Sequence, residues 1–183
     1  MQDVMLDLET MGTANDAAIV AIGAVEFDVV GGTVGEVFYY PIDLGSSVAE
    51  GGVIDASTVM WWLRQSDAAR EALSNRGDTL HIRQGLHSFT AWLSARGQDV
   101  RVWGNGAAFD NVILAQAYRR MGLPVPWAHW NDRCYRTVKA LYPDIKIQRM
   151  GVHHNAGDDA VSQAEHLLQI LAAQRDQEYT YDQ

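Results

Sequence analysis

The sequence predicts an α/β fold in which a mixed central sheet is flanked by helices. Between residues 4 and 42, extended apolar runs alternate with glycine-containing turns, as in an antiparallel meander. Further along the chain, apolar residues recur at the three-and-four spacing of helices, and this pattern is interrupted by a strand-like run. Strands followed by helices that alternate with strands are typical of a mixed sheet.

The N-terminal strands are expected at 4–8, 19–29 and 33–42. Because short turn-prone segments join them, we expect these three strands to pair antiparallel. The polar, glycine-containing stretch 43–52 that follows is expected to be a loop. A later strand at 100–104 comes after helices, which are the connection that a parallel pairing requires.

Two short helices are expected after the loop. Ser57 is a candidate N-cap for a helix through 59–65, and Ser66 or Asp67 for a second helix through 68–73. Both are only a few residues long, so packing against the sheet would have to stabilise them.

Three longer helices are expected at 82–95, about 109–121 and about 158–173. In each of them apolar side chains recur at helical spacing and form one buried stripe. Gly97 and Gly122 are suitable stops for the first two.

Length and composition fit one domain. At 183 residues, 48% of them hydrophobic, the chain can bury a substantial core, which we expect over 1–175, with a polar C-terminal tail over 176–183. The single cysteine, Cys134, excludes an internal disulfide. No apolar run approaches the roughly 20 residues that span a bilayer, and the early first strand leaves no room for a signal peptide. A cytoplasmic location without membrane contact is therefore expected.

The formal net charge of -9 argues against proteins that grip long duplexes through many phosphates, because those are strongly basic. Nucleic acid stays possible as a substrate. Carboxylates that bind metal ions contribute to the formal charge, while the ions are not counted. If this chain acts on nucleic acid, we expect it to hold a short end.

Asp7 and Glu9 share one face of the first strand. Side chains alternate along a strand, so both carboxylates point away from the layer that receives Leu6 and Leu8. Like charges this close repel unless a cation or a shifted pKa compensates them. Mg²⁺ and Mn²⁺ prefer oxygen ligands, so the pair is a candidate metal site; solvated acids on an exposed strand are the alternative.

Asp110 is a further candidate acid, in the first turn of the helix after the strand at 100–104. Loops at the carboxyl ends of strands commonly carry functional groups in α/β proteins. Asn105 and Phe109 precede it and offer an amide for hydrogen bonding and a ring for base stacking. An acid here also interacts favourably with the helix dipole, and that alternative stays open.

A histidine suits the role of a water-activating base, because its unperturbed pKa of about 6.5 lies near neutral pH. His153 and His154 precede Asp158 and Asp159, and both His–Asp pairs have the same five-residue offset. Helical periodicity does not choose between the two aspartates, which flank the apolar face at similar angles. From the residues alone, both pairs remain candidates.

Together these segments resemble the DEDDh, or DnaQ-like, family of 3′→5′ exonucleases, and the resemblance covers most of the chain. The family motif D-x-E-T-x-G is matched by 7–12, and N-x₂₋₃-F-D by 105–110. The motif H-x₄-D is best matched by His154 and Asp159, because small residues then fall where family members carry them.

The resemblance implies an RNase H-like fold and two divalent cations, Mg²⁺ or Mn²⁺. It implies that the metals are held by Asp7, Glu9, Asp110 and Asp159, and that His154 is the general base. The expected reaction is hydrolysis that releases nucleoside 5′-monophosphates from the 3′ ends of single-stranded RNA or DNA.

Candidate substrate contacts surround these motifs, and they are Thr10, Met11, Trp61, Trp62, Asn105 and Phe109. Adjacent tryptophans on a short helix cannot share a face, so at least one of the pair is expected in the core or an interface. The other can stack on a base. The Trp-Trp pair also resembles a bacterial and phage exoribonuclease-like subgroup, and RNA is favoured over DNA.

A loosely basic interval lies between the second and third motifs. Its cations either follow the phosphates of a short single strand or are solvated loop charges: Arg133, Arg136, Lys139, Lys146 and Arg149. Asp132 is interpreted as structural rather than as a further metal ligand.

Two other classes of function stay open. One is a non-catalytic nucleic-acid or nucleotide-binding module of the same fold, against which the complete set of acids argues. The other is a metal-dependent hydrolase of small nucleotides. A homodimer is also expected, since related enzymes often dimerise.

Overall fold

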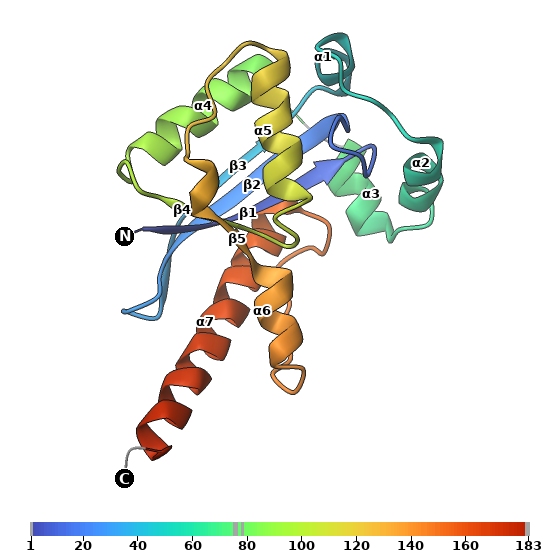
Figure 1. Cartoon of the computed structure of the whole chain (residues 1–183). Coiled ribbons are helices and arrows are strands. Elements are labelled where there is room, and N and C mark those ends of the chain that lie inside the picture. Colours follow the sequence, from blue (N-terminus) through green and yellow to red (C-terminus); the bar gives the residue numbers. More distant parts are fainter. Residues whose placement is uncertain (1, 75–76, 78, 182–183) are drawn as a thin grey trace.

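The computed structural model describes residues 2–74, 77 and 79–181 and contains a five-stranded sheet with helices on both faces (Figure 1). The strand order is β3-β2-β1-β4-β5, in which the pairs β3-β2 and β2-β1 are antiparallel and the pairs β1-β4 and β4-β5 are parallel. The strands are β1 (Asp3–Thr10), β2 (Ile19–Asp28), β3 (Thr33–Pro41), β4 (Arg101–Gly104) and β5 (Asp132–Cys134). The predicted mixed sheet, antiparallel at its N-terminal side and parallel beyond, is confirmed.

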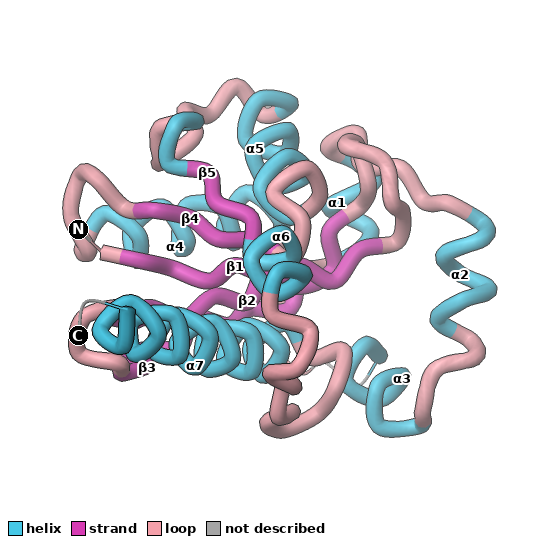
Figure 2. Tube along the Cα trace, turned by 60° about the horizontal axis from the view of Figure 1, so that its bottom comes forward, coloured by secondary structure: helices cyan, strands magenta, loops and turns pink. Residues whose placement is uncertain are grey.

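Helices cover the two faces of the sheet in pairs. Figure 2 shows α6 (Tyr135–Leu141) and α7 (Ala156–Tyr181) in front of the sheet, and α4 (Ile82–Ser94) and α5 (Asp110–Arg120) behind it. None of the helices in the described part of the chain has the length and apolar character needed to cross a membrane.

The alternation of β1 divides its side chains between these layers. Leu6 and Leu8 belong to the core cluster on the α4 and α5 side, together with Leu86 and Leu114. Met5 belongs to the cluster on the α7 side. Asp7 and Glu9, two and four positions after Met5, therefore face the layer that contains α7.

The N-terminus of α7 packs directly on the backbone of β2 at Gly23, which lies opposite Asp7 in the sheet. A Cβ atom at Gly23 would lie 2.1 Å from the backbone carbon of Ala156 and 2.5 Å from the nitrogen of Gly157. Only glycine permits this approach. It brings the first turn of α7 beside the end of β1.

The predicted loop at 43–52 is wrong in part, because Asp43 caps a short helix, α1 (Leu44–Ala49). The next helix, α2 (Ala56–Trp62), begins earlier than predicted. Its N-cap is Asp55, whose carboxylate accepts from two backbone N–H groups, and not Ser57. The helix α3 (Asp67–Ser74) begins after Ser66, whose hydroxyl oxygen accepts from the N–H of Ala69 at 3.2 Å, so Ser66 is the cap among the two predicted candidates.

Other differences lie in the C-terminal half. The helix α6 and a short 3₁₀ helix (His129–Asn131) were not predicted. The last helix, α7, continues to Tyr181, so its predicted end near residue 173 is too early, and the expected tail at 176–183 is helical as far as it is described. Residues 182 and 183 lie outside the described part of the chain.

Candidate active site

The predicted acids come together at the end of β1. Asp7, Glu9 and Asp159 each place a carboxylate oxygen within 4.8 Å of the others. These three residues and Asp110 line one pocket of about 150 Å³, here called the acid pocket. The acids come from β1, α5 and α7, so the fold gathers three distant segments of the sequence.

Asp110 is the first residue of α5 and is only 2% exposed. Its Oδ1 accepts from the backbone N–H of Leu8 at 3.2 Å. The pairing of β1 with β4 ends at Leu6 and Gly104, so Leu8 lies beyond this parallel ladder, although it still pairs with Ile22 of β2. The short parallel strand thus leaves a donor that fixes the carboxylate of Asp110.

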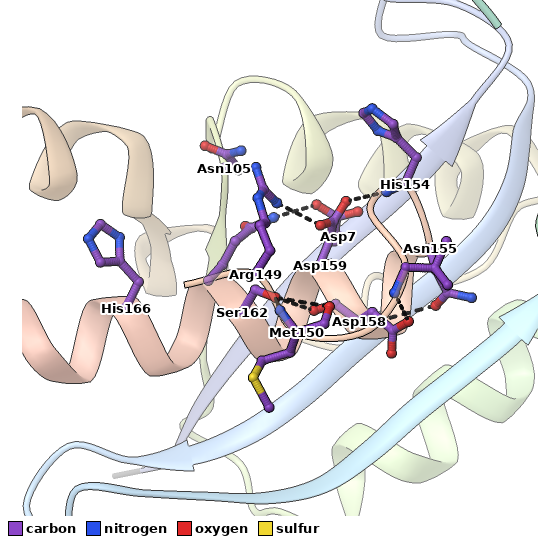
Figure 3. A network of polar contacts seen from close by, with 12 residues as sticks. Asp7, Asn105, Arg149, Met150, His154, Asn155, Asp158, Asp159, Ser162 and His166 are labelled. Atoms are coloured by element: carbon purple, nitrogen blue, oxygen red, sulfur yellow. Dashed lines mark hydrogen bonds and ion pairs between the residues drawn. The ribbon is translucent and has the colours of Figure 1, made fainter. Parts of the chain in front are cut away.

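Asp159 lies one turn into α7 and is tied down by the preceding loop (Figure 3). Its Oδ2 accepts from the backbone N–H of His154 at 2.9 Å, and its Oδ1 pairs with Nη1 of Arg149 at 2.6 Å. Asp158 instead accepts from the backbone N–H of Val152 and does not line the acid pocket. Of the two candidate aspartates, the structure places Asp159 among the acids.

Burial makes this group of like charges costly. Burial raises the pKa of Asp7 well above its usual value, and the charges of Asp110, Glu9 and Asp159 raise it further, while a hydrogen bond from Gln163 opposes the shift. Burial also raises the pKa of Asp110 to about 7 against its hydrogen bond from Leu8. A bound divalent cation would offset both effects.

The donor set fits such a cation. The acids supply oxygen ligands, as Mg²⁺ and Mn²⁺ prefer. The negative charge of Asp7 is repelled by those of the neighbouring acids, and a bound cation would relieve this repulsion. Asp7, Glu9, Asp110 and Asp159 are the residues that would hold it.

His154 stands at one side of the acid pocket. It is a non-glycine residue with positive φ, at 69°, and its backbone N–H bond to Asp159 supports this conformation. Its ring packs edge-on against Trp61 and Trp62, with centroids 5.0 and 5.8 Å away. Burial lowers the pKa of His154, and the charge of neighbouring His153 lowers it further. The ring is thereby kept neutral near pH 7, as a proton acceptor must be.

His153 is the alternative base. It also lines the acid pocket, and its ring stacks on that of His154 with the centroids 3.8 Å apart. In contrast to His154, it is exposed. The more enclosed histidine is therefore His154.

A larger pocket of about 510 Å³, here called the nucleoside pocket, adjoins the acid pocket. Leu8, Glu9 and Phe109 line both pockets. Hydroxyl groups and aromatic rings form most of the remaining wall, which comprises Thr10, Gly12, Thr13, Ser57, Thr58, Trp61, Trp62 and Arg64.

The two tryptophans have different environments, as their adjacency predicts. Trp62 is 4% exposed, and its Nε1–H donates to the carbonyl of Thr10 at 3.0 Å. Trp61 is 43% exposed. Trp61 therefore offers a free ring surface to the nucleoside pocket, whereas Trp62 forms its fixed wall.

Met11 was predicted to contact substrate together with the backbone at Thr10, and this stays a prediction. Its side chain packs with Ala18, Val20 and Trp62 in a small core cluster. Its N–H donates to Ala18, and its carbonyl accepts from the N–H of Asp55. These contacts leave the residue as a support of the loop rather than as a wall of either pocket.

Asn105 and Asp132 occupy their predicted settings. Asn105 lines the acid pocket, where its Oδ1 accepts from Nζ of Lys139 at 3.3 Å. Asp132 accepts from the side chains of Asn111 and Trp127, both at 2.8 Å, and so joins β5 to α5. Its role is structural, as interpreted from the sequence.

Gln163 lines the acid pocket but was not recognised in the sequence. Its Nε2 donates to Oδ1 of Asp7 at 2.7 Å. It lies four residues after Asp159 on α7, and residues so spaced share a helix face. That spacing is the signal that would have identified it.

Comparisons with known proteins identify the family of this chain. A family model described as the 3'-5' exoribonuclease Rv2179c-like domain matches residues 2–171. A protein of Enterobacteria phage T4 named exodeoxyribonuclease is 27% identical in an alignment of 165 positions, which covers 77% of this chain and 72% of the phage protein.

Solved structures show the same fold at low sequence identity. The nuclease domain of 3'hExo, described as a DEDDh family member bound to rAMP, has a TM-score of 0.62 at 12% identity and covers 94% of this chain and 92% of its own. Exonuclease X in complex with 5' overhanging duplex DNA has a TM-score of 0.56 at 19% identity, with 93% and 92% covered. The predicted RNase H-like fold is confirmed.

Proposed function

Since the chain belongs to the family of Rv2179c-like 3'-5' exoribonuclease domains, within the DEDDh exonucleases, we propose that it shortens single-stranded RNA from the 3′ end. Each cycle releases one nucleoside 5′-monophosphate. Asp7, Glu9, Asp110 and Asp159 hold two divalent cations, Mg²⁺ or Mn²⁺, and His154 is the general base.

The adjacency of the two pockets is the observation that carries this proposal. The nucleoside pocket, at about 510 Å³, is within the size range of small-ligand sites. It shares a wall with the acid pocket, so a terminal nucleoside held in the first pocket brings its 5′-phosphodiester to the second. This arrangement suits removal of a single end nucleotide.

Bound divalent cations supply Lewis-acid chemistry, which activates water and offsets charge on the phosphodiester. The protein contributes position and proton transfer. The backbone bond from His154 to Asp159 fixes the histidine next to the acids, and its lowered pKa leaves the ring neutral. The neutral ring takes the proton of the attacking water, and Trp61 forms an open ring surface on which the terminal base stacks.

The proposal includes a preference for RNA over DNA. Hydroxyl groups of Thr13, Ser57 and Thr58 and the carboxylate of Glu9 line the nucleoside pocket, and such groups recognise a ribose 2′-OH. The family description also names ribonucleic acid, whereas the phage relative is named for deoxyribonucleic acid. Sugar preference therefore needs a direct measurement.

The proposed activity and its sugar preference are tested together by digesting 5′-labelled single-stranded RNA and DNA of equal sequence in Mg²⁺, in Mn²⁺ and in EDTA. The expected result is stepwise shortening in either metal, faster for RNA, and none in EDTA. Internal cuts, or shortening that survives EDTA, would contradict the proposal. Faster digestion of DNA would overturn the RNA preference alone.

Two other expectations stay predictions. A homodimer would elute from size-exclusion chromatography, with light scattering, at twice the mass of one chain. A cytoplasmic location would be tested by fractionation of the native cells.

A further inference from the structure

Three cations gather on one side of the acid pocket. Arg136 and Arg149 line it, and Lys139 reaches the same place through its contact with Asn105. None of the three cations lines the nucleoside pocket. Figure 3 shows Arg149 and Asn105 on one side of Asp7 and Asp159, with the ring of His154 on the other. Since His154 packs against the tryptophans of the nucleoside pocket, the cations lie on the far side of the acids from that pocket.

Their positive charges are close together. Burial lowers the pKa of Lys139, and the neighbouring charges of Arg136 and Arg149 lower it further. The ring of Tyr135 is the nearest aromatic partner, 5.0 Å from Nζ of Lys139. A partly buried lysine crowded by two arginines is costly without a nearby anion.

Carboxylates compensate this charge only in part. Among the ion pairs of the described residues, Arg149 pairs with Asp159, and no pair includes Arg136 or Lys139. Arg149 uses one guanidinium nitrogen for Asp159, which leaves further N–H donors. The side chain of Arg136 crosses Gly106, whose positive φ of 120° and lack of a Cβ keep the guanidinium close to the loop. The charge of Arg136 acts on Asp110, but neither Arg136 nor Lys139 is in an ion pair within the described residues, so both keep donors that an anionic ligand can use.

A single strand bound as proposed supplies that anion. With the terminal nucleoside in its pocket and the scissile phosphodiester at the acids, the strand continues away from the nucleoside pocket. The next phosphate upstream then arrives on the far side of the acids, where the cations lie.

We propose that Arg136, Lys139 and Arg149 form a binding site for the second phosphate from the 3′ end of the strand. The inference rests on the proposed function and deepens it, because it gives the protein a reason to prefer a strand over a mononucleotide. The site recognises charge and not sequence, since a phosphate carries no base identity.

The experiment neutralises that one phosphate. Oligonucleotides of the sugar type that the protein digests are made with either a phosphodiester or an uncharged methylphosphonate at the second linkage from the 3′ end. The first cleavage is measured as kcat/KM for wild type, Arg136→Gln, Lys139→Gln and the double variant. Lys146→Gln is the matched control, because it removes the same charge from the loop that carries Arg149, while its Nζ contacts the carbonyl of Pro143 outside the pocket.

In wild type and Lys146→Gln, the methylphosphonate is expected to lower kcat/KM about tenfold, the usual scale for losing one charge-assisted contact. In the double variant the two oligonucleotides should differ less than about threefold. A methylphosphonate at the fourth linkage should affect all proteins equally.

Two results would overturn the site. One is that wild type cleaves both oligonucleotides with equal kcat/KM. The other is that the variants lose kcat/KM by the same factor on both oligonucleotides, because the cations would then contact a group other than the second phosphate. Failure of wild type to shorten the unmodified strand is a different result, since it removes the proposed function and the inference with it.

Discussion

Gln163, Leu8 and His154 each donate a hydrogen bond to one acid of the pocket, to Asp7, Asp110 and Asp159 respectively. Two of these donors are backbone N–H groups, which every substitution except proline keeps. Gln163 is the side chain among them, and it is 2% exposed. Partners of this kind orient metal ligands and tune their affinity.

Gln163→Leu is expected to weaken Mn²⁺ binding about 10–100-fold, because Asp7 loses its donor and its carboxylate is free to turn. Isothermal titration calorimetry measures the effect. Gln169→Leu, at an exposed position on the same helix, should bind Mn²⁺ as wild type does. Equal affinity in Gln163→Leu and wild type would remove Gln163 from the site.

His154→Ala is expected to lower kcat about 10²–10⁴-fold, the usual contribution of a positioned base. Mn²⁺ affinity should change little, because the bond from residue 154 to Asp159 comes from the backbone. His153→Ala is the matched control and should lose far less, since its ring is exposed. If the two variants exchanged these effects, His153 would be the base.

Among the site residues, the sequence predicts those whose positions follow from the two-residue alternation of a strand or from the start of a helix. Asp7 and Glu9 share a face because strands alternate, and Asp110 falls at a helix start because of the strand and glycines before it. Asp158 and Asp159 differ by one position on a helix, so periodicity left both open. The loop contacts of Val152 and His154 decide between them in space, and no local pattern encodes those contacts.

The junction of β1, β2 and α7 is the element-level cause of the site. Gly23 lets α7 approach β2 opposite Asp7, so the first turn of the helix reaches the end of the strand. Asn155 caps that turn by accepting from the N–H groups of Gly157 and Asp158. Both features place the carboxylate of Asp159 beside that of Asp7.

Gly23→Ala is expected to destabilise the fold by about 1–3 kcal/mol, because its Cβ would overlap the backbone of α7, which cannot move like a flexible side chain. Mn²⁺ affinity should fall as well, since the helix carrying Asp159 is displaced. Urea unfolding and calorimetry measure the two effects. Gly45→Ala, in α1 with ordinary contacts only, should keep both.

The helices α1 and α6 were not predicted from the sequence, whereas the equally short α2 was. The helices α1 and α6 have six and seven residues, too few to show a repeating apolar stripe. Asp55 caps α2 in place of the predicted Ser57, and both residue types are good caps. The extension of α7 to Tyr181 runs through polar residues, whose composition suggested a tail.

Across the whole molecule, the nucleoside pocket, the acid pocket and the three cations lie in that order. The overall charge of -9 does not reveal this arrangement, in which the cations come from the basic interval at 133–149 and the acids from β1, α5 and α7. The mixed sheet with three antiparallel N-terminal strands could be predicted from strand spacing and connections, whereas the strand β5 at its edge was not. The pockets could not, because they depend on which side chains meet across distant segments.

Metal-free protein should lose stability as pH rises. The folded pKa of Asp110 is raised to about 7, whereas an unfolded aspartate has a pKa near 3.9. Between these values the folded state holds a proton that the unfolded state has released, so this group's stabilisation is complete below about pH 4 and is lost through pH 7. Asp7, whose pKa is also raised, acts in the same direction.

Asp110→Asn isolates this effect from other titrating groups. In EDTA, the variant should gain Tm relative to wild type by several degrees between about pH 4 and pH 7. Addition of Mn²⁺ at neutral pH should raise the Tm of wild type more than that of the variant. A difference in Tm that stays constant with pH would show that burial does not raise the pKa of Asp110.

Release of the 3′-terminal nucleotide tests the central claim most directly. A single strand labelled only in its last nucleoside is incubated with Mg²⁺ and with wild type or Asp7→Asn, and the first labelled product is identified by mass. The account predicts that wild type releases labelled nucleoside 5′-monophosphate as the first product and that folded Asp7→Asn releases none. A labelled nucleoside without phosphate, a labelled internal fragment, or full release by Asp7→Asn would contradict it.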